Sequence, residues 1–84
     1  MKLEFTEQAL ADFEYWKTTD PKKADKIKRL IANALETPSS GLGKPEQLRF
    51  DLAGCWSRRI DREHRLVYTV KDDTLIVLAC RFHY

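Results

Sequence analysis

The spacing of apolar residues changes once along this chain of 84 residues, at a loop of small and polar residues over positions 39–45. Before the loop, apolar side chains recur every three or four positions, which is typical of helices with one buried face. After it, they alternate with polar side chains or form short runs, which is typical of β-strands. This order predicts an α+β domain, with two N-terminal helices packed on one face of a mainly antiparallel sheet of about four to five strands.

Two helices are predicted in the first half, after a short strand over residues 2–5. Thr6 is suited to cap the first helix, because its hydroxyl can accept a hydrogen bond from the first turn. We expect the acidic residues of this helix on the side opposite its apolar positions, which are Ala9, Leu10, Phe13 and Trp16. Asp20 and Pro21 begin the second helix, and Thr37 followed by Pro38 ends it. The apolar stripe of the second helix is Ala24, Ile27, Ile31, Ala34 and Leu35.

Strands are predicted in the second half over residues 48–52, 55–60, 65–70 and 74–82. The last is almost wholly apolar until its end, so we expect it inside the sheet with a strand on either side. If Arg59 lies opposite Arg65 across the turn at residues 61–64, then Ser57 shares their face of the sheet. His64 lies in that turn and is interpreted as structural.

The composition excludes several classes of protein. A chain of this length allows one domain, residues 1–84. Its longest apolar run, residues 75–80, is too short to cross a bilayer, and the first residues do not resemble a secretory signal, so a cytoplasmic location is expected. Cys55 and Cys80 are too few for a disulfide scaffold, and we expect Cys80 to be a reduced core residue. Because no cysteines or histidines are spaced as metal ligands, neither a metal nor another cofactor is predicted.

The basic residues change from lysine to arginine along the chain. Residues 1–43 contain six Lys and one Arg against seven acids, whereas residues 44–84 contain two Lys and six Arg against six acids. Because the planar guanidinium group matches phosphate and stacks on bases, the second half is predicted to bind a polyanion. Arg59 and Arg65, if they are paired, are either solvated at the sheet edge or held together by a bound anion.

Several residues of the second half can be interpreted either as ordinary surface or structural residues or as catalytic or binding residues. Glu46 is either a surface acid paired with Lys44 or a general base at the rim of the sheet. His83 is either an exposed imidazole at the end of the chain or a proton donor, and Tyr84 is either an apolar plug or a stacking partner for a base. A base, an acid and cations together are what attack of an RNA 2′-hydroxyl on its own phosphate requires, without a metal.

Four segments of the sequence together resemble one family of proteins. They are residues 44–46 (KPE), 54–60 (GCWSRRI), 63–68 (EHRLVY) and 79–84 (ACRFHY). With the length of the chain, these segments resemble the YoeB toxins, a branch of the RelE superfamily. The resemblance implies a RelE-like, microbial ribonuclease-type fold. It also implies a toxin of a bacterial type II toxin–antitoxin pair that cleaves mRNA in the ribosomal A site and so inhibits translation.

The resemblance also implies roles for individual residues. Glu46 is expected to accept the proton, His83 to donate one, Arg65 to stabilise the phosphorane, and Tyr84 to position the substrate base. The residues expected to hold phosphates of mRNA or ribosomal RNA are Lys44, Arg49, Arg58 and Arg59.

The partners implied by the resemblance are the ribosome, a YefM-like antitoxin with a segment that folds on binding, and a second copy of the toxin. The toxin–antitoxin complex is expected to repress its own operon, touching DNA only through the antitoxin, and no membrane partner is expected. Two other functions remain open from the residues. One is a non-catalytic module that inhibits translation by binding RNA or the ribosome, and the other is a gyrase-poisoning relative with the same fold.

Overall fold

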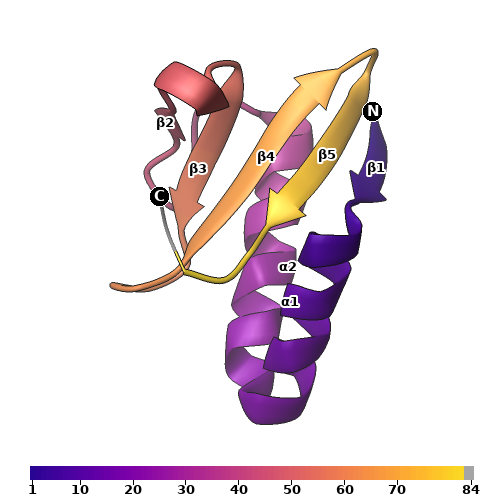
Figure 1. The fold of residues 1–84 in the computed structure, drawn as a ribbon, viewed down its shortest axis with the longest axis vertical. Helices are drawn as coiled ribbons and strands as arrows, with labels where there is room; N and C mark the ends of the chain where they lie inside the picture. The colour runs from indigo at the N-terminus through magenta and orange to yellow at the C-terminus, as the bar shows by residue number, and fades with distance from the viewer. Residues whose placement is uncertain (83–84) are drawn as a thin grey trace.

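The computed structural model describes residues 1–82, which form two helices and a five-stranded sheet (Figure 1). The elements are β1 (Lys2–Phe5), α1 (Glu7–Thr19), α2 (Pro21–Glu36), β2 (Glu46–Gln47), β3 (Cys55–Arg59), β4 (Arg65–Lys71) and β5 (Thr74–Ala79). The strand order is β1-β5-β4-β3-β2, in which β1 and β5 are parallel and the other pairs are antiparallel. The predicted α+β class is therefore confirmed, and β5 lies inside the sheet as expected.

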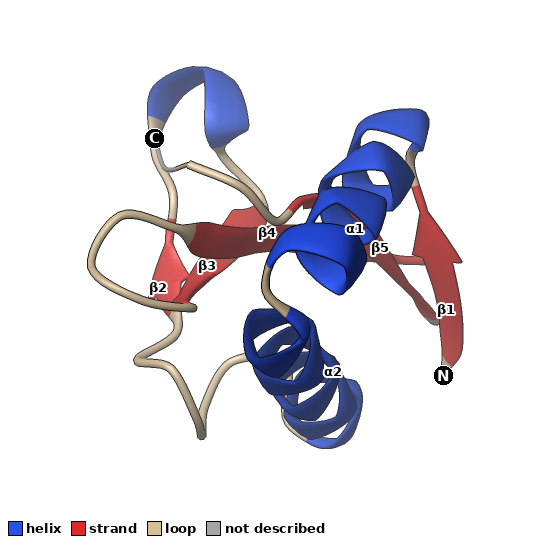
Figure 2. Ribbon diagram, turned by 90° about the horizontal axis from the view of Figure 1, so that it is seen from below, coloured by secondary structure: helices blue, strands red, loops and turns tan. Residues whose placement is uncertain are grey.

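One hydrophobic core joins the two helices, which run side by side, to a single face of the sheet (Figure 1). Its central members come from α2, β4 and β5, and they include Ile27, Leu30, Leu66, Tyr68, Leu75 and Val77. Figure 2 shows a short 3-10 turn, Phe50–Leu52, on the side of the sheet opposite α2. No helix within residues 1–82 is both long and apolar enough to cross a bilayer.

Both predicted helix caps are present. The Thr6 hydroxyl accepts a hydrogen bond from the Ala9 amide at 3.1 Å, and the Asp20 carboxylate accepts one from the Lys23 amide at 3.3 Å. Pro21 occupies the first position of α2. These contacts satisfy amides that the first turn of a helix leaves without partners, so the two helices begin where the sequence indicates.

The buried face of α1 differs from the prediction. Leu10 is 53% exposed, whereas Asp12, expected on the solvent side, is 4% exposed. The Asp12 carboxylate accepts hydrogen bonds from the Cys80 amide at 3.0 Å and from the Gln8 side chain at 2.7 Å. Because α1 packs against the end of β5, where the ladder stops, a buried acceptor is needed there more than an apolar side chain.

Two predicted strands also differ from the structure. The segment over residues 48–52 was expected to be a strand because its apolar residues alternate, but the strand here is only Glu46–Gln47. A 3-10 turn follows, in which Phe50 is 91% exposed. The last strand ends at Ala79 rather than at residue 82. Alternation alone does not make a strand where no partner strand continues beside it.

The register of the β3–β4 hairpin agrees with the prediction. Arg59 lies opposite Arg65, and Ser57 lies opposite Val67. Because side chains alternate along a strand, Arg59, Arg65 and Ser57 share the face of the sheet that points away from the helices. The other face carries Arg58, which extends toward α2.

Candidate functional site

A groove rich in basic side chains lies where α2 approaches the β3–β4 hairpin. It consists of two adjacent hollows of about 420 and 380 Å³, both lined by Lys26 and Arg59. Its six basic residues, which define what we call the basic groove, are Lys26, Arg29, Lys44, Arg59, Arg62 and Arg65. Such a concentration of positive charge beside an open sheet face is suited to an extended polyanion.

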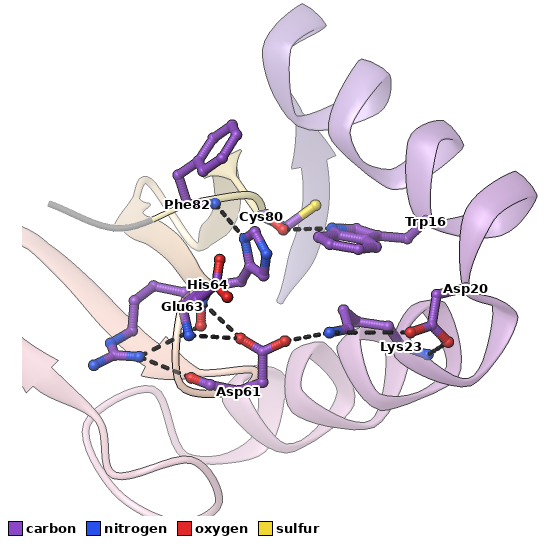
Figure 3. Close-up of polar contacts among 9 residues, drawn as sticks. Trp16, Asp20, Lys23, Asp61, Glu63, His64, Cys80 and Phe82 are labelled. Atoms are coloured by element: carbon purple, nitrogen blue, oxygen red, sulfur yellow. Dashed lines mark hydrogen bonds and ion pairs between the residues drawn. The ribbon is translucent and has the colours of Figure 1, made fainter.

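Among residues 1–82, the one acid that lines this groove is Asp61, and its charge is neutralised by other groups (Figure 3). Its carboxylate accepts hydrogen bonds from the amides of Glu63 and His64, both at 2.8 Å, and forms an ion pair with Lys23 of α2. Burial raises the pKa of Asp61, but the hydrogen bond from Lys23 and the two amides outweigh it and lower this pKa to about 2. The same hydrogen bond raises the pKa of Lys23.

The Asp61–Lys23 pair is expected to make stability depend on pH in the acid range. Because the pKa of Asp61 is lowered from 3.8 to about 2, its stabilising contribution is complete above 3.8 and is lost as the pH falls through about 2. We expect the free energy of unfolding of wild type to exceed that of Asp61→Asn by about 1 kcal/mol near neutral pH. The difference is this small because solvent screens a partly exposed ion pair. The amide oxygen of the variant can still accept from the turn. Urea unfolding at several pH values measures the difference in the free energy of unfolding between the two proteins, which should become smaller below about pH 4. A difference that does not change with pH would contradict this prediction.

The two arginines of the hairpin face each other at the edge of the basic groove. Arg59 is exposed, and its side chain makes no hydrogen bond or ion pair with any of residues 1–82. Arg65 is half-buried, and its Nη1 donates to the Asp61 carbonyl at 3.0 Å. Like charges directly opposite each other destabilise a sheet, so an anion placed between the two guanidinium groups is favoured. This geometry supports the interpretation of the pair as an anion site.

Glu46 lies on the same open face as these arginines. It is exposed at the start of β2 and lies opposite Ser57, which in turn lies opposite Val67. Neighbouring strands are about 4.8 Å apart, so the row of Glu46, Ser57 and Val67 spans about 10 Å across β2, β3 and β4. Arg59 and Arg65 lie two residues from Ser57 and Val67 along β3 and β4, on the same face. The register therefore brings a carboxylate and two guanidinium groups to one face of the sheet.

His83 and Tyr84, predicted as proton donor and base-stacking residue, lie outside the described residues. The last described residue is Phe82, whose carbonyl accepts a hydrogen bond from the Arg65 amide at 2.8 Å. The described chain thus ends beside the first residue of β4.

Arg58, predicted to hold phosphate, has a different role in the structure. It is fully buried, and all five of its N–H groups donate to protein oxygens. The acceptors are the Tyr68 hydroxyl, the Asn33 side chain and the carbonyls of Thr37, Ser40 and Leu42, at 2.6–3.0 Å. The prediction for Arg58 is therefore wrong, because no donor is left for a phosphate and no part of the side chain is exposed.

The other predicted phosphate ligands are exposed, and the structure adds three further candidates. Lys44 lines the basic groove, whereas Arg49 is exposed before the 3-10 turn, outside the groove as defined here. The sequence prediction missed Lys26, Arg29 and Arg62. The spacing of Lys26 and Arg29 on one side of α2 was the available signal, but it was interpreted as an ordinary solvated helix surface.

The two cysteines do not form a nucleophilic site. Cys80 is fully buried, and burial, with a contribution from Asp12, raises the pKa of its thiol to about 12. Burial also raises the pKa of Cys55. Since the thiolate is the reactive form, a raised pKa makes both thiols less reactive near neutral pH. Over the part of the chain that the structure describes, no three His, Cys, Asp or Glu residues form a metal-binding group.

Comparison with known proteins gives concordant matches over the whole chain. Residues 5–84 match the family model described as YoeB-like toxin of bacterial type II toxin-antitoxin system. Toxin YoeB of Escherichia coli K12 is 51% identical over 84 residues, covering 100% of both chains. The solved YoeB/ParE toxin of Agrobacterium tumefaciens is 52% identical, with a TM-score of 0.97 and 100% coverage of both chains.

Two solved structures from Staphylococcus aureus are also similar, a YoeB-YefM complex and a YoeB dimer. They are 39% and 40% identical to this chain, with TM-scores of 0.91 and 0.92. Each match covers 100% of this chain and 98% of the other.

Proposed function

Because this chain belongs to the YoeB-like toxin family of bacterial type II toxin–antitoxin systems, we propose that it is a ribosome-dependent endoribonuclease that cleaves mRNA and inhibits translation. The observation that carries this proposal is the shared open face of Glu46, Arg59 and Arg65, beside the basic groove. That face offers an acid–base group and positive charge to one phosphodiester of an RNA strand.

The proposed reaction proceeds by attack of a ribose 2′-oxygen on the adjacent phosphorus. Glu46 removes the 2′-hydroxyl proton, the new bond forms from the 2′-oxygen to phosphorus, and the bond to the 5′-oxygen breaks. His83 donates a proton to the departing 5′-oxygen, which leaves a 5′-hydroxyl and a 2′,3′-cyclic phosphate. Tyr84 positions the base by stacking. The roles of His83 and Tyr84 stay predictions, since both residues lie outside those described.

The contacts of Arg65 support its proposed role in stabilising the charge of the phosphorane. Its Nη1 is engaged by the carbonyls of Asp61 and His64, at 3.0 and 3.5 Å, whereas no oxygen of residues 1–82 accepts from its Nε or Nη2. One edge of the guanidinium group is therefore held in place while the remaining donors are available to a phosphate. Fixed donors of this kind need little reorganisation when negative charge develops in the transition state.

The basic groove is proposed to hold the backbone of mRNA or ribosomal RNA. Lys44 and Arg59 retain the role predicted from sequence, Lys26 and Arg62 join them, and Arg49 stays a predicted contact outside the groove. Binding of this kind releases counterions and weakens steeply as salt concentration rises.

We expect the partners to follow those of the relatives. The Staphylococcus aureus YoeB forms a complex with YefM and a dimer, so a YefM-like antitoxin and a second copy of the chain are proposed for this protein. Repression of the operon would require the DNA-binding part of the antitoxin. The ribosome, as the proposed target, implies action in the cytoplasm.

Cell-free translation with mapped transcript ends tests the proposed function. Purified protein should cut mRNA only in the presence of ribosomes and should leave 5′-hydroxyl ends with 2′,3′-cyclic or 3′-phosphate ends. Arrested translation with intact transcripts would identify a non-catalytic binder, which is the main alternative. Ends with a 5′-phosphate would indicate metal-assisted cleavage instead. DNA-damage signalling on expression, without mRNA cleavage, would indicate a gyrase-poisoning relative.

A further inference from the structure

The segment after β5 is held in place although it belongs to no strand (Figure 3). We call residues 80–82 the exit segment. At its first residue, the Cys80 amide donates to Asp12 at 3.0 Å, and the Trp16 indole N–H donates to the Cys80 carbonyl at 2.8 Å. At its last residue, the Phe82 amide donates to Nδ1 of His64 at 2.7 Å, and the Phe82 carbonyl accepts from the Arg65 amide. Four hydrogen bonds therefore fix the path of this short segment.

His64 is held firmly enough to act as an anchor. It is 9% exposed, and its ring packs edge-on against Trp16 with centroids 4.7 Å apart. Its own amide donates to Asp61, which is paired with Lys23 of α2. Because a ring nitrogen accepts only when it carries no proton, the contact with Phe82 also fixes the tautomer, with the proton on Nε2. The imidazole is thus attached to both helices, through Trp16 and through Asp61.

Phe82 adopts a backbone conformation that needs such support. Its φ of 63° lies in the left-handed region, which is unfavourable for a residue with a side chain. A conformation of this kind persists only where the surrounding structure holds it. The contacts with His64 and Arg65 fix both polar groups of the Phe82 backbone, and so they hold this residue in its left-handed conformation.

We propose that His64 is a positioning residue for RNA cleavage, which fixes Phe82 beside Arg65 by accepting the hydrogen bond from the Phe82 amide. This inference rests on the proposed function, in which the proton donor is the next residue, His83. His64 itself touches no substrate. Its hydrogen-bond acceptor matters because a small displacement of an acid–base group lowers the rate of the chemical step strongly.

Asparagine and leucine branch at Cγ, as histidine does. Substituting each at position 64 therefore separates the effect of the hydrogen-bond acceptor from the effect of side-chain volume. In His64→Asn, the amide oxygen takes the place of Nδ1 at the same number of bonds from the backbone, whereas His64→Leu offers no acceptor there. We expect His64→Leu to lower kcat at least tenfold with little change in KM for programmed ribosomes. The His64→Asn variant should recover to within threefold of wild type. Equal rates in the two variants, or a change confined to KM, would overturn the inference.

Hydrogen exchange of the Phe82 amide supplies a readout that does not depend on activity. Protection should be retained in His64→Asn and should fall at least tenfold in His64→Leu; equal protection in the two variants would contradict the proposed contact. If His64→Leu does not fold by circular dichroism, His64→Gln replaces it, because its amide lies one bond too far and should behave as the leucine variant does.

Wild type and His83→Ala are measured in the same assay to separate the two proposals. If wild type does not cleave, the proposed function fails and the role of His64 falls with it. If wild type cleaves and His83→Ala cleaves equally well, the proton-donor role of His83 fails, and the role of His64 with it. If these two behave as proposed but His64→Leu cleaves as wild type does, only the role of His64 fails.

Discussion

Replacing Arg65 or His83 with alanine is expected to lower the rate of ribosome-dependent mRNA cleavage by more than about 10²-fold, the lower range for acid–base catalysis. Arg65→Ala removes donors from the developing negative charge, and His83→Ala removes the proton for the departing oxygen. The loss in the double variant should be smaller than the product of the two single losses, because both groups act on one transition state. The measurement is the rate of transcript cleavage in cell-free translation, compared at saturating protein.

Lys71→Ala is the matched control for this prediction. Lys71 is exposed at the other end of β4, about 20 Å from Arg65 at the usual rise per residue, so it loses a positive charge on the same strand far from the site. We expect cleavage by this variant to equal that of wild type. Full cleavage by the double variant of Arg65 and His83 would refute the catalytic assignment of both residues.

Replacing Arg58 with alanine is expected to destabilise the domain by at least about 3 kcal/mol, whereas Arg59→Ala should change its stability by less than about 0.5 kcal/mol. Arg58→Ala leaves the carbonyls of Thr37, Ser40 and Leu42 without the donors of the buried guanidinium group, and it opens a cavity under α2. Arg59 is exposed and its side chain makes no hydrogen bond or ion pair within residues 1–82, so truncating that side chain removes no such contact there. Urea unfolding of both variants measures the difference.

The same two variants should differ in their effect on ribosome binding. Arg59→Ala is expected to weaken ribosome binding, because one phosphate contact is lost. The slope of the logarithm of the binding constant against the logarithm of the salt concentration should become shallower by about one. Arg58→Ala, at a temperature where it is folded, should retain the salt dependence of wild type. Equal loss of stability in the two variants would contradict the structural role of Arg58. A reduced salt dependence in Arg58→Ala alone would restore it as a phosphate ligand.

The different roles of Arg58 and Arg59 also show how far sequence-based prediction reached. The register places Arg58 on the same face as Trp56, Leu66 and Tyr68, which is typical of the covered face of a sheet, yet the sequence prediction gave Arg58 to phosphate. The acceptors that make burial of a guanidinium group possible, however, belong to the loop that follows α2. Their arrangement depends on how the loop packs, which no local pattern in the strand indicates.

Prediction from sequence met the same limit for Asp12 and for the basic groove. An acid on a helix is normally solvated, and only the end of the β5 ladder, 68 residues away, makes a buried acceptor favourable at position 12. Likewise, Lys26 of α2 and Arg62 of the hairpin become one groove only after the helix has packed on the sheet. A single exposed basic residue on a helix or in a turn is common and does not indicate a groove.

The sequence by itself determined the two helices, their caps, the hairpin register and the family, because these depend on local spacing, on backbone preferences and on motifs that are contiguous in the chain. The tertiary structure decided which charged groups are buried, which share the basic groove and how His64 holds the chain leaving β5. Those outcomes depend on contacts between segments far apart in sequence, where burial removes water from some charged groups and leaves it around others.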